Sequence, residues 1–404
     1  MKMKRFLSLA LVGAMSLSLL AGCGPKDKQP SGSASGSQPT ATSIKVAAVQ
    51  NGFSDTYENM WTEIAAAFEA ETGVKVELTT SKTLEDEIGP AMQGGEYNDV
   101  IYLPEGRPGA LTEQFIKDKL MVDITDVLDM KVPGEEVKVS EKLMPGFAET
   151  SKTNPYGDGK TYLAPMHYDP CGLFYNAGLL KEKGWEVPQT WDQMWELGEK
   201  AKAEGIALFT YPTTGYFDAF LYALVYTVGG PEFFDKATHY EEGIWDTDEA
   251  KTMFGILEKL ASYTAAVTPA QANDNDFRMN QQLILDNKAL FMPNGSWISG
   301  EMADAPKADG FEWGITALPA VKADGDRYSF CWFQQMWIPQ GAANVDAAKQ
   351  FIAFMYSDKA IEIFNKGGAT QPVKGVTDTL EGDKKTFFSV YDNAKAANGR
   401  LRCL

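Results

Sequence analysis

The sequence predicts an α/β protein built from two lobes. Strand and helix signals alternate at the start of the folded region, which is the pattern of a parallel α/β sheet. The length of 404 residues suits two domain-sized units, and a hydrophobic fraction of 44% suits globular cores. A third observation is that residues 157–176 have the pattern of a chain passing from one lobe to another.

This crossing begins with a turn signal at Gly157-Asp158-Gly159, where two glycines are free to take a positive φ. Two extended runs follow, Thr161 to Met166 and Gly172 to Tyr175. Between them lies a short polar joint, His167-Tyr168-Asp169-Pro170, whose proline disfavours a helical conformation at the residue before it. We therefore expect two strands separated by a stiff joint.

The first lobe begins with three predicted strands, at 44–49, 74–78 and 99–103. Apolar residues at helical spacing between the first two predict a helix that Ser54 caps and Gly73 ends. In open sheets of this kind, ligands bind beyond the carboxyl ends of the strands. Polar residues follow two of these ends, and they are candidate ligand contacts: Gln50, Asn51, Glu105 and Arg107.

The second lobe contains a capping box, with Thr190 as the cap and Gln193 at the third helical position. A strand at 206–210 leads into a predicted loop at 211–217 that contains Tyr216. The predicted helices then cover 218–228, 247–262 and 273–286, before an apolar run at 289–292. Tryptophans at packing positions on predicted helices are expected to be structural: Trp61, Trp191 and Trp195.

An aromatic stretch from Arg327 to Pro339 has the pattern of a return crossing. Strand alternation places Trp332 and Gln334 on one face of it, and one face must look towards the space between the lobes. We therefore count this pair among the candidate ligand contacts. A helix that Asn344 caps is expected to follow, with apolar residues on one face.

The N-terminus has the pattern of a secretory signal. Lys2, Lys4 and Arg5 precede an apolar stretch from Phe6 to Leu20 that is too short for a comfortable membrane span. Leu20-Ala21-Gly22-Cys23 resembles the bacterial lipobox, whose cysteine becomes lipid-modified; the alternative is an ordinary signal with an incidental cysteine. We expect a signal peptide at 1–22 and a lipid-anchored flexible linker at 23–43.

Charge and cysteine content exclude several classes. Loss of the three basic residues in the signal leaves 34 basic against 55 acidic side chains, a net charge of −21 that nucleic acid would repel. With Cys23 assigned to lipid, three cysteines remain, so at least one is unpaired within the chain. The chain has only two histidines and no Cys-x-x-Cys, so we expect no metal site and no cofactor.

Several stretches together resemble the extracellular solute-binding proteins of carbohydrate ABC transporters, the group that includes maltose-binding protein. The resemblance covers most of residues 44 to 375 and rests on these stretches in this order: Gly157 to Pro165, Leu173 to Asn176, Pro188 to Asp192, Asn287 to Trp297, Trp337 to Pro339 and Ala347 to Met355.

The resemblance implies a two-lobed periplasmic-binding-protein type 2 fold. Each lobe would be a mixed sheet flanked by helices, with hinge strands joining the lobes and a ligand in the cleft between them. It places lobe one at 44–166 plus 336–375 and lobe two at 170–330 plus 376–404. Many family members continue for several dozen residues further, so we expect a shortened C-terminal end.

The resemblance also assigns candidate ligand residues, each with a structural alternative. Trp297 aligns with a sugar-stacking tryptophan, although it could instead plug the core of its lobe, and Tyr216 matches a stacking position where a loop tyrosine could be filler. Asp169 aligns with a hinge carboxylate that contacts sugar hydroxyls. Its structural alternative is a side-chain-to-backbone hydrogen bond that stabilises the hinge turn. Arg107 matches a family position, and its structural alternative is a surface salt bridge. His167 could donate a hydrogen bond to a sugar hydroxyl, but it ranks second because a lone histidine is more often structural.

Adjacent crossings would also bring Cys171 and Cys331 close. A disulfide there would restrict hinge bending, so we expect these cysteines to be reduced or only conditionally paired.

The implied function is capture of a sugar or oligosaccharide by a monomeric, lipid-anchored receptor that delivers it to the permease subunits of an ABC importer. Two alternatives stay open at this point: a secreted glycan-acting enzyme, and a sugar-sensing lipoprotein without transport. No nucleophile elbow, phosphate loop or metal spacing favours an enzyme. The form Phe-Met-Pro-Asn-Gly-Ser-Trp, which ends at Trp297, resembles that of N-acetylglucosamine or chito-oligosaccharide binders.

Overall fold

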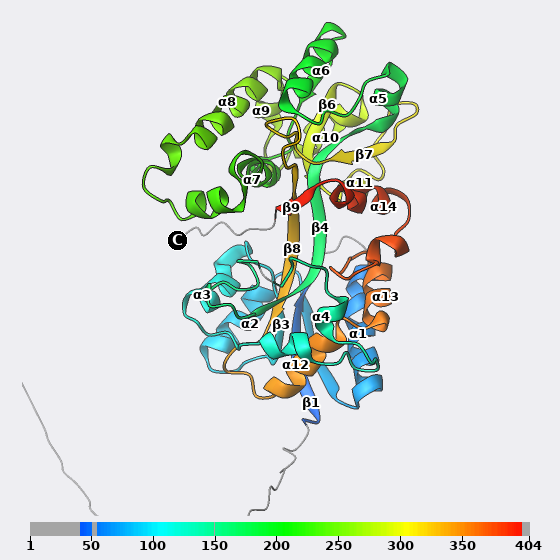
Figure 1. Cartoon of the computed structure of the whole chain (residues 1–404). Helices are drawn as coiled ribbons and strands as arrows, with labels where there is room; N and C mark the ends of the chain where they lie inside the picture. The colour runs from blue at the N-terminus through cyan, green and yellow to red at the C-terminus, as the bar shows by residue number, and fades with distance from the viewer. Residues whose placement is uncertain (1–40, 51–54, 149, 398–404) are drawn as a thin grey trace, which may run out of the picture. The chain divides into compact units, whose positions relative to one another are not determined.

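The computed structural model describes residues 41–50, 55–148 and 150–397 (Figure 1). The expected signal peptide, the lipidation site Cys23, nearly all of the linker, Asn51, the predicted cap Ser54 and the last residues of the chain lie outside these ranges. No helix in the described ranges is both long and apolar enough to cross a membrane.

Three parallel strands begin the fold, as predicted: β1 (Ser43–Val49), β2 (Lys75–Ser81) and β3 (Val100–Tyr102). Two helices connect them, α1 (Asp55–Thr72) and α2 (Leu84–Gln93). They belong to a mixed sheet with the strand order β2-β1-β3-β8-β4-β6-β5. Trp61 of α1 is fully buried, with its ring 4.8 Å from that of Tyr102, so its predicted structural role is confirmed.

Two long strands, β4 (Leu163–Asn176) and β8 (Tyr328–Trp337), run antiparallel through the middle of the molecule (Figure 1). At one end β8 pairs with β3, and at the other end β4 pairs with β6 (Ala289–Gly295) and β7 (Trp313–Thr316). The two expected crossings therefore lie side by side and join the two parts of the sheet.

The expectation of two strands separated by a polar joint is wrong, because residues 163–176 form one unbroken strand. The register shifts once, between Pro165 and His167, but the ladder continues through Asp169 and Pro170. Proline fixes φ near −65°, a value that extended backbone also tolerates. Pro170 alone therefore could not have shown where a strand ends.

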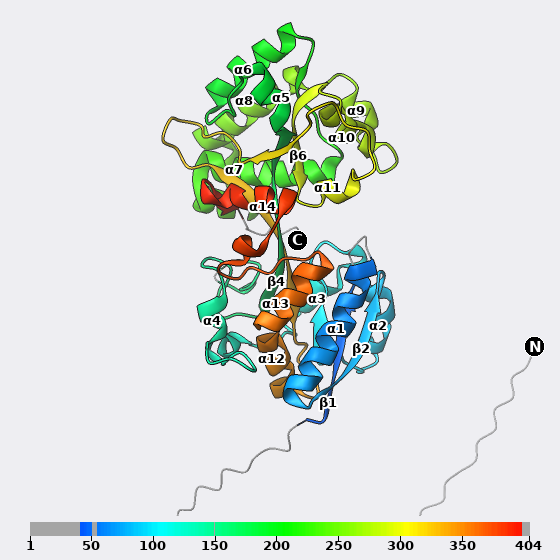
Figure 2. The ribbon, with the colours of Figure 1, turned by 90° about the vertical axis from the view of Figure 1, so that its right-hand side faces the viewer.

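The first part is covered by α1, α2 and the C-terminal helices α12 (Val345–Phe354) and α13 (Asp358–Gly367) (Figure 2). The second part surrounds β5 (Ala207–Phe209), β6 and β7, and its own buried cluster includes Trp191, Phe209 and Phe220. The helices of the second part are α5 (Ala177–Lys183), α6 (Trp191–Ala203), α7 (Thr214–Thr238), α8 (Asp248–Tyr263), α9 (Thr268–Gln271), α10 (Phe277–Leu285) and α11 (Ile298–Glu301). Shorter elements elsewhere are η1 (Pro108–Ala110), α3 (Leu111–Lys117), η2 (Thr125–Asp129), α4 (Val139–Lys142), η3 (Ile244–Asp246) and η4 (Val376–Thr379).

The capping box at the start of α6 is confirmed, because the Gln193 amide donates to the Thr190 hydroxyl and the Gln193 side chain reaches back. Trp191 is buried and stacks on Trp195, which confirms that both are structural. Helix α7 differs from its prediction. It begins at Thr214, so Tyr216 lies in a helix and not in a loop. Its first helical stretch ends as predicted, because Gly230 has a non-helical φ of 72°.

The C-terminal segment returns to the long strands. It consists of α14 (Gly382–Phe388), η5 (Ser389–Asp392) and β9 (Lys395–Ala397), which pairs in parallel with β8. The ring of Phe388 lies 4.8 Å from that of Tyr168, and the Tyr391 hydroxyl donates to the Phe330 carbonyl. The segment therefore packs directly on β4 and β8 (Figure 2).

Candidate functional site

Four predicted site residues share one face of the β4–β8 pair. His167 lies directly opposite Gln334, and Asp169 lies directly opposite Trp332. Directly opposed residues in an antiparallel pair project to the same side, as do residues two apart on one strand. The two crossings thus combine a carboxylate, an imidazole, an amide and an indole on a single surface, which we call the crossing face.

The other face of the same strands is packed. Tyr168 and Phe333 are paired there, and their rings lie 5.3 and 5.6 Å from that of Phe147. Phe388 covers Tyr168 from the C-terminal segment. Because this side is filled with aromatic rings, the crossing face is the polar side of the pair.

Asp169 is the electrostatic centre of the crossing face. Its Oδ1 accepts a hydrogen bond from the Ser296 hydroxyl, and its Oδ2 lies 3.1 Å from Nε2 of His167. Burial opposes ionisation, but the charge and hydrogen bond of His167, the Ser296 hydroxyl and the charge of Lys384 lower the pKa of Asp169 overall. Asp169 is therefore an ionised acceptor at neutral pH.

The order of these contacts does not fit nucleophilic catalysis. In a serine hydrolase the histidine stands between serine and carboxylate, so that it can take the serine proton. Here the carboxylate of Asp169 stands between Ser296 and His167. The arrangement fixes the Asp169 carboxylate in position, and no imidazole within the described ranges contacts the Ser296 hydroxyl as it would in a catalytic triad.

Neighbouring side chains hold Gln334 and Trp332. The Tyr102 hydroxyl donates to Oε1 of Gln334 over 2.6 Å. The ammonium of the buried Lys152 lies 5.0 Å from the ring centre of Trp332, within cation–π range. A Cβ placed on Gly106 would lie 3.9 Å from Cη2 of Trp332, so the loop after β3 reaches the edge of this ring.

That loop carries Glu105 and Arg107. Arg107 forms an ion pair with Glu85 at 2.9 Å and donates to the Lys82 carbonyl. The salt bridge that was the structural alternative for Arg107 is therefore present. Gln50 donates to the Thr80 hydroxyl over 3.2 Å. The structure thus brings Glu105 and Arg107 near Trp332, while their ligand roles and that of Gln50 stay predictions. Asn51 lies outside the described residues.

Trp297 and Tyr216 form a second group, in the second part. Their rings are 6.0 Å apart and meet edge to face at an interplanar angle of 63°. The Tyr216 hydroxyl donates to Oε1 of Glu301 over 2.6 Å, and Gln281 donates to Oε2 over 2.7 Å. Burial, reinforced by the carboxylate of Glu301, raises the pKa of Tyr216, so its hydroxyl stays protonated.

The Trp297 ring folds back over the end of β6, where a Cβ at Gly295 would lie only 2.2 Å from it. A side chain at position 295 would therefore force the Trp297 ring to move. Between the two stands Ser296, whose hydroxyl bonds Asp169 and whose amide donates to the Pro170 carbonyl. This short segment connects the Trp297 group to the crossing face.

Sequence reasoning missed Ser296 and Glu301. Ser296 stands next to Trp297 in the quoted Asn-Gly-Ser-Trp motif, so its position beside a predicted ligand residue was a usable signal. Glu301 follows Trp297 by four residues, which is one helical turn, and that spacing could also have indicated it.

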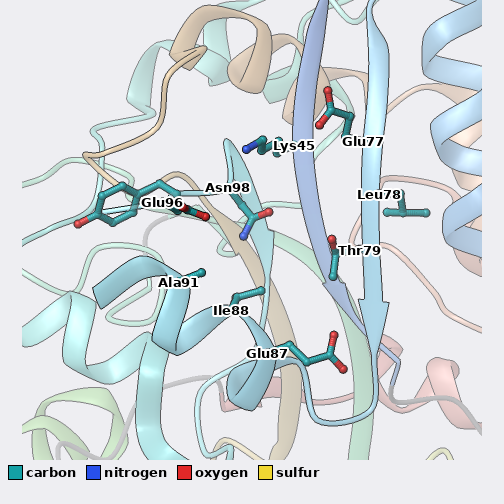
Figure 3. Close-up of a pocket in the computed structure, with 10 residues that line it drawn as sticks. Lys45, Glu77, Leu78, Thr79, Glu87, Ile88, Ala91, Glu96 and Asn98 are labelled. Atoms are coloured by element: carbon teal, nitrogen blue, oxygen red, sulfur yellow. The ribbon is translucent and has the colours of Figure 1, made fainter. Parts of the chain in front are cut away.

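A separate pocket of about 470 Å³ lies between α2 and the exposed side of β1 and β2 (Figure 3). Lys45 and Glu77, which are register partners, line it together with Thr79, Glu87 and Asn98. None of the predicted site residues contributes to it. Among the described residues, no group of histidine, cysteine, aspartate and glutamate side chains could hold a metal ion.

The crossing face and the Trp297 group together suit a neutral, hydroxyl-rich ligand. Carboxylate and amide groups can bind hydroxyls in pairs, and indole and phenol rings can cover apolar C–H surfaces.

Comparison with known proteins agrees with this chemistry. The sequence profile of the family described as bacterial extracellular solute-binding protein matches residues 63–385. The chain is 24% identical over 352 residues to the diacetylchitobiose binding protein NgcE of Streptomyces coelicolor, covering 85% of this chain and 72% of that protein. It is 23% identical over 408 residues to a maltooligosaccharide ABC transporter solute-binding lipoprotein of Streptococcus pneumoniae, covering 94% and 85%.

Solved structures show the same fold. The bacterial solute receptor AcbH, described as preferring β-D-galactopyranose, matches with a TM-score of 0.70 and 19% identity over 89% of this chain and 87% of that one. A chitin oligosaccharide binding protein matches with a TM-score of 0.63 and 20% identity over 89% of each chain. The predicted two-lobed fold of the type 2 periplasmic binding proteins is confirmed.

Proposed function

The chain belongs to the bacterial extracellular solute-binding proteins, and on this basis we propose that it captures a sugar or oligosaccharide and delivers it to an ABC importer. The observation that carries the proposal is the crossing face, where Asp169, Trp332, His167 and Gln334 stand together on two paired strands. Members of this family bind their solutes and do not transform them, so the enzyme alternative is not supported.

The ligand would contact three groups of side chains. Hydroxyls would donate to Asp169 and accept from Gln334 or His167, and the rings of Trp297 and Trp332 would cover C–H faces. Tyr216 would extend the aromatic surface on the second part. Contacts from both parts favour the conformation in which they approach each other. We propose that lobe one comprises residues 44–166 and 336–375, and that lobe two comprises residues 170–330 and 376–404.

The class of sugar is a separate proposal, because the relatives are named for different sugars. They include proteins named for diacetylchitobiose, maltooligosaccharide and galactooligosaccharide. The Asn-Gly-Ser-Trp motif and the diacetylchitobiose relative support N-acetylated oligosaccharides as the first class to test.

We also propose that Cys23 carries a lipid that anchors the monomeric receptor on the outer side of the membrane. A relative named as a solute-binding lipoprotein supports this assignment. Metabolic labelling with a palmitate analogue should mark the wild-type chain and not Cys23→Ala. Equal labelling of the two would refute the anchor.

The function is tested by titration calorimetry with chito-, malto- and galacto-oligosaccharides. We expect one class to bind with one molecule per chain, and we expect no new reducing ends after long incubation. Absence of heat with every sugar would contradict the proposal, and release of new reducing ends would restore the enzyme alternative. Accumulation of labelled sugar in cells that express this receptor together with an ABC permease separates transport from sensing.

A further inference from the structure

The connection between α7 and α8 presents aromatic side chains that the fold does not bury. Tyr240 is 69% exposed, Trp245 is 43% exposed and Phe254 is 52% exposed. The rings of Trp245 and Phe254 lie 6.2 Å apart, so they form one surface. We call residues 232–254 the α7–α8 knob; in Figure 1 it includes the connection between these two helices.

The knob has a defined backbone path and a small core of its own. Helix α7 kinks at Gly230 and Pro231, and its last turns lead into a tight loop in which Tyr240 has φ 54°. Beneath the exposed rings lies a small core of its own, made of Phe233, Ala237, Ile244 and Ala250. A solvent-exposed tyrosine in the left-handed region has few contacts within the chain to offset the strain of its backbone. Such positions often serve a function.

Charge around the knob selects the partner. Residues 232–254 carry seven acidic side chains against two lysines. Both lysines are already engaged, Lys236 with Glu232 at 2.8 Å and Lys251 with Asp248 at 3.6 Å. Across the described parts of the chain, Glu242, Asp246 and Glu249 have no ion-pair partner. The excess negative charge thus surrounds the aromatic surface.

We propose that the α7–α8 knob is a docking surface for a basic protein partner whose surface has an apolar recess for Trp245 and Phe254. Aromatic side chains of this kind dominate protein interfaces, and a charged rim steers the approach of the partner. A second copy of this chain would bring acid against acid, and an anionic membrane would be repelled. We take the importer's membrane subunits to be this partner, and this choice rests on the proposed function.

The test uses the membrane and ATP-hydrolysing subunits of a carbohydrate ABC importer from the source organism, reconstituted in nanodiscs. Full-length receptor is titrated into it, and binding and stimulated ATP hydrolysis are measured. The variants are Trp245→Ser with Phe254→Ser, a neutralised rim (Glu242→Gln, Asp246→Asn, Glu249→Gln), and the matched control Met279→Ser. Met279 is also 52% exposed but lies on α10.

We expect the aromatic double variant to need roughly tenfold more receptor for half-maximal binding. The rim variant should bind more weakly at low salt and lose most of the salt dependence of the wild type. Met279→Ser should stay within about twofold of the wild type. Sugar affinity measured by calorimetry should be unchanged in all three, because the knob contains no predicted site residue.

Wild-type binding by the aromatic variant, or no binding of the wild type to the importer, would overturn the docking surface while leaving sugar capture intact. If calorimetry finds two sugars bound per wild-type chain and only one per chain of the aromatic variant, the knob is a carbohydrate site and the docking proposal is overturned. A concentration-dependent dimer that the variant abolishes would do the same. Failure of the wild type to bind any sugar would instead refute the proposed function, whereas importer binding measured without sugar still tests the surface.

Discussion

Replacement of Asp169 by asparagine separates its two possible roles, ligand contact and strand support. The change keeps the shape and leaves one oxygen to accept from Ser296, but it removes the charge beside His167. Hydrogen bonds to a charged group contribute about 1.5–3 kcal/mol against about 1 kcal/mol for neutral pairs. We therefore expect the free energy of unfolding to fall by about 1–2 kcal/mol.

The effect on binding should be larger. A carboxylate can accept two sugar hydroxyls at once, and each charge-assisted bond that becomes neutral costs about 1 kcal/mol. Since 1.4 kcal/mol corresponds to tenfold in affinity, the dissociation constant should rise by about 10- to 100-fold. Calorimetry with the best ligand of the panel measures this change, and a urea titration measures the stability of the same variant.

Asp99 provides the matched control. Its carboxylate is buried and accepts from the backbone amides of Lys45 and Asn344 over 2.8 Å each, but it lies in the first part away from the crossing face. Asp99→Asn should lose stability and keep its sugar affinity. Unchanged affinity in Asp169→Asn would refute a ligand role for Asp169. An equal loss of affinity in Asp99→Asn would show that general destabilisation explains both.

Three further outcomes follow from the structure. Trp297→Ala should weaken sugar binding by about 10- to 100-fold while unfolding at nearly the wild-type urea concentration; unchanged binding would place its ring in the lobe core. A non-reducing mass map should find Cys171 and Cys331 as free thiols, and a quantitative bridge between them would contradict the register. Between pH 7 and about 4 the stabilisation from ionised Asp169 should stay constant, and it should fade as pH drops through the lowered pKa; urea titrations should therefore show a shallower acid loss in Asp169→Asn than in the wild type.

The cysteine result has a geometric cause. Cys171 pairs with Phe330 and Cys331 pairs with Pro170, so the two cysteines are offset by one residue along neighbouring strands. An offset of one residue sends their side chains to opposite faces of the sheet. Both are buried and free, and Cys171 belongs to the core of the second part while Cys331 belongs to that of the first. The sequence predicted that they would be close, but only the register shows that they face apart.

Local signals predicted much of the fold. The strands β1 to β3, the capping box at Thr190 and the pairing of the two crossings rest on periodicity and turn chemistry, which act over a few residues. The predicted end of the helix at residue 228 is confirmed, because Gly230 has a positive φ and breaks α7 into two helical stretches. The predicted cap at Asn344 was wrong, because its side chain makes no cap hydrogen bond and its amide donates to Asp99 instead.

The site was predicted best where strand alternation governs it. Trp332 and Gln334 share a face because of the period of a strand, and that period is visible in the sequence. The ion pair between Arg107 and Glu85, and the bond from Ser296 to Asp169, join residues 22 and 127 positions apart. No local pattern records such partners, since tertiary packing chooses them.

The two faces of the β4–β8 pair carry the proposed ligand contacts on one side and packed aromatic rings on the other. The strands stay paired from Leu163 and Trp337 to Cys171 and Phe330, so a change of angle between the two parts must twist this ladder. Its packed face is filled by Phe147 and by Phe388 of the C-terminal segment, and close packing resists such a twist. A ligand on the crossing face must therefore supply enough contact energy to offset that resistance. Substitutions at Phe388 should consequently change sugar affinity without touching the sugar.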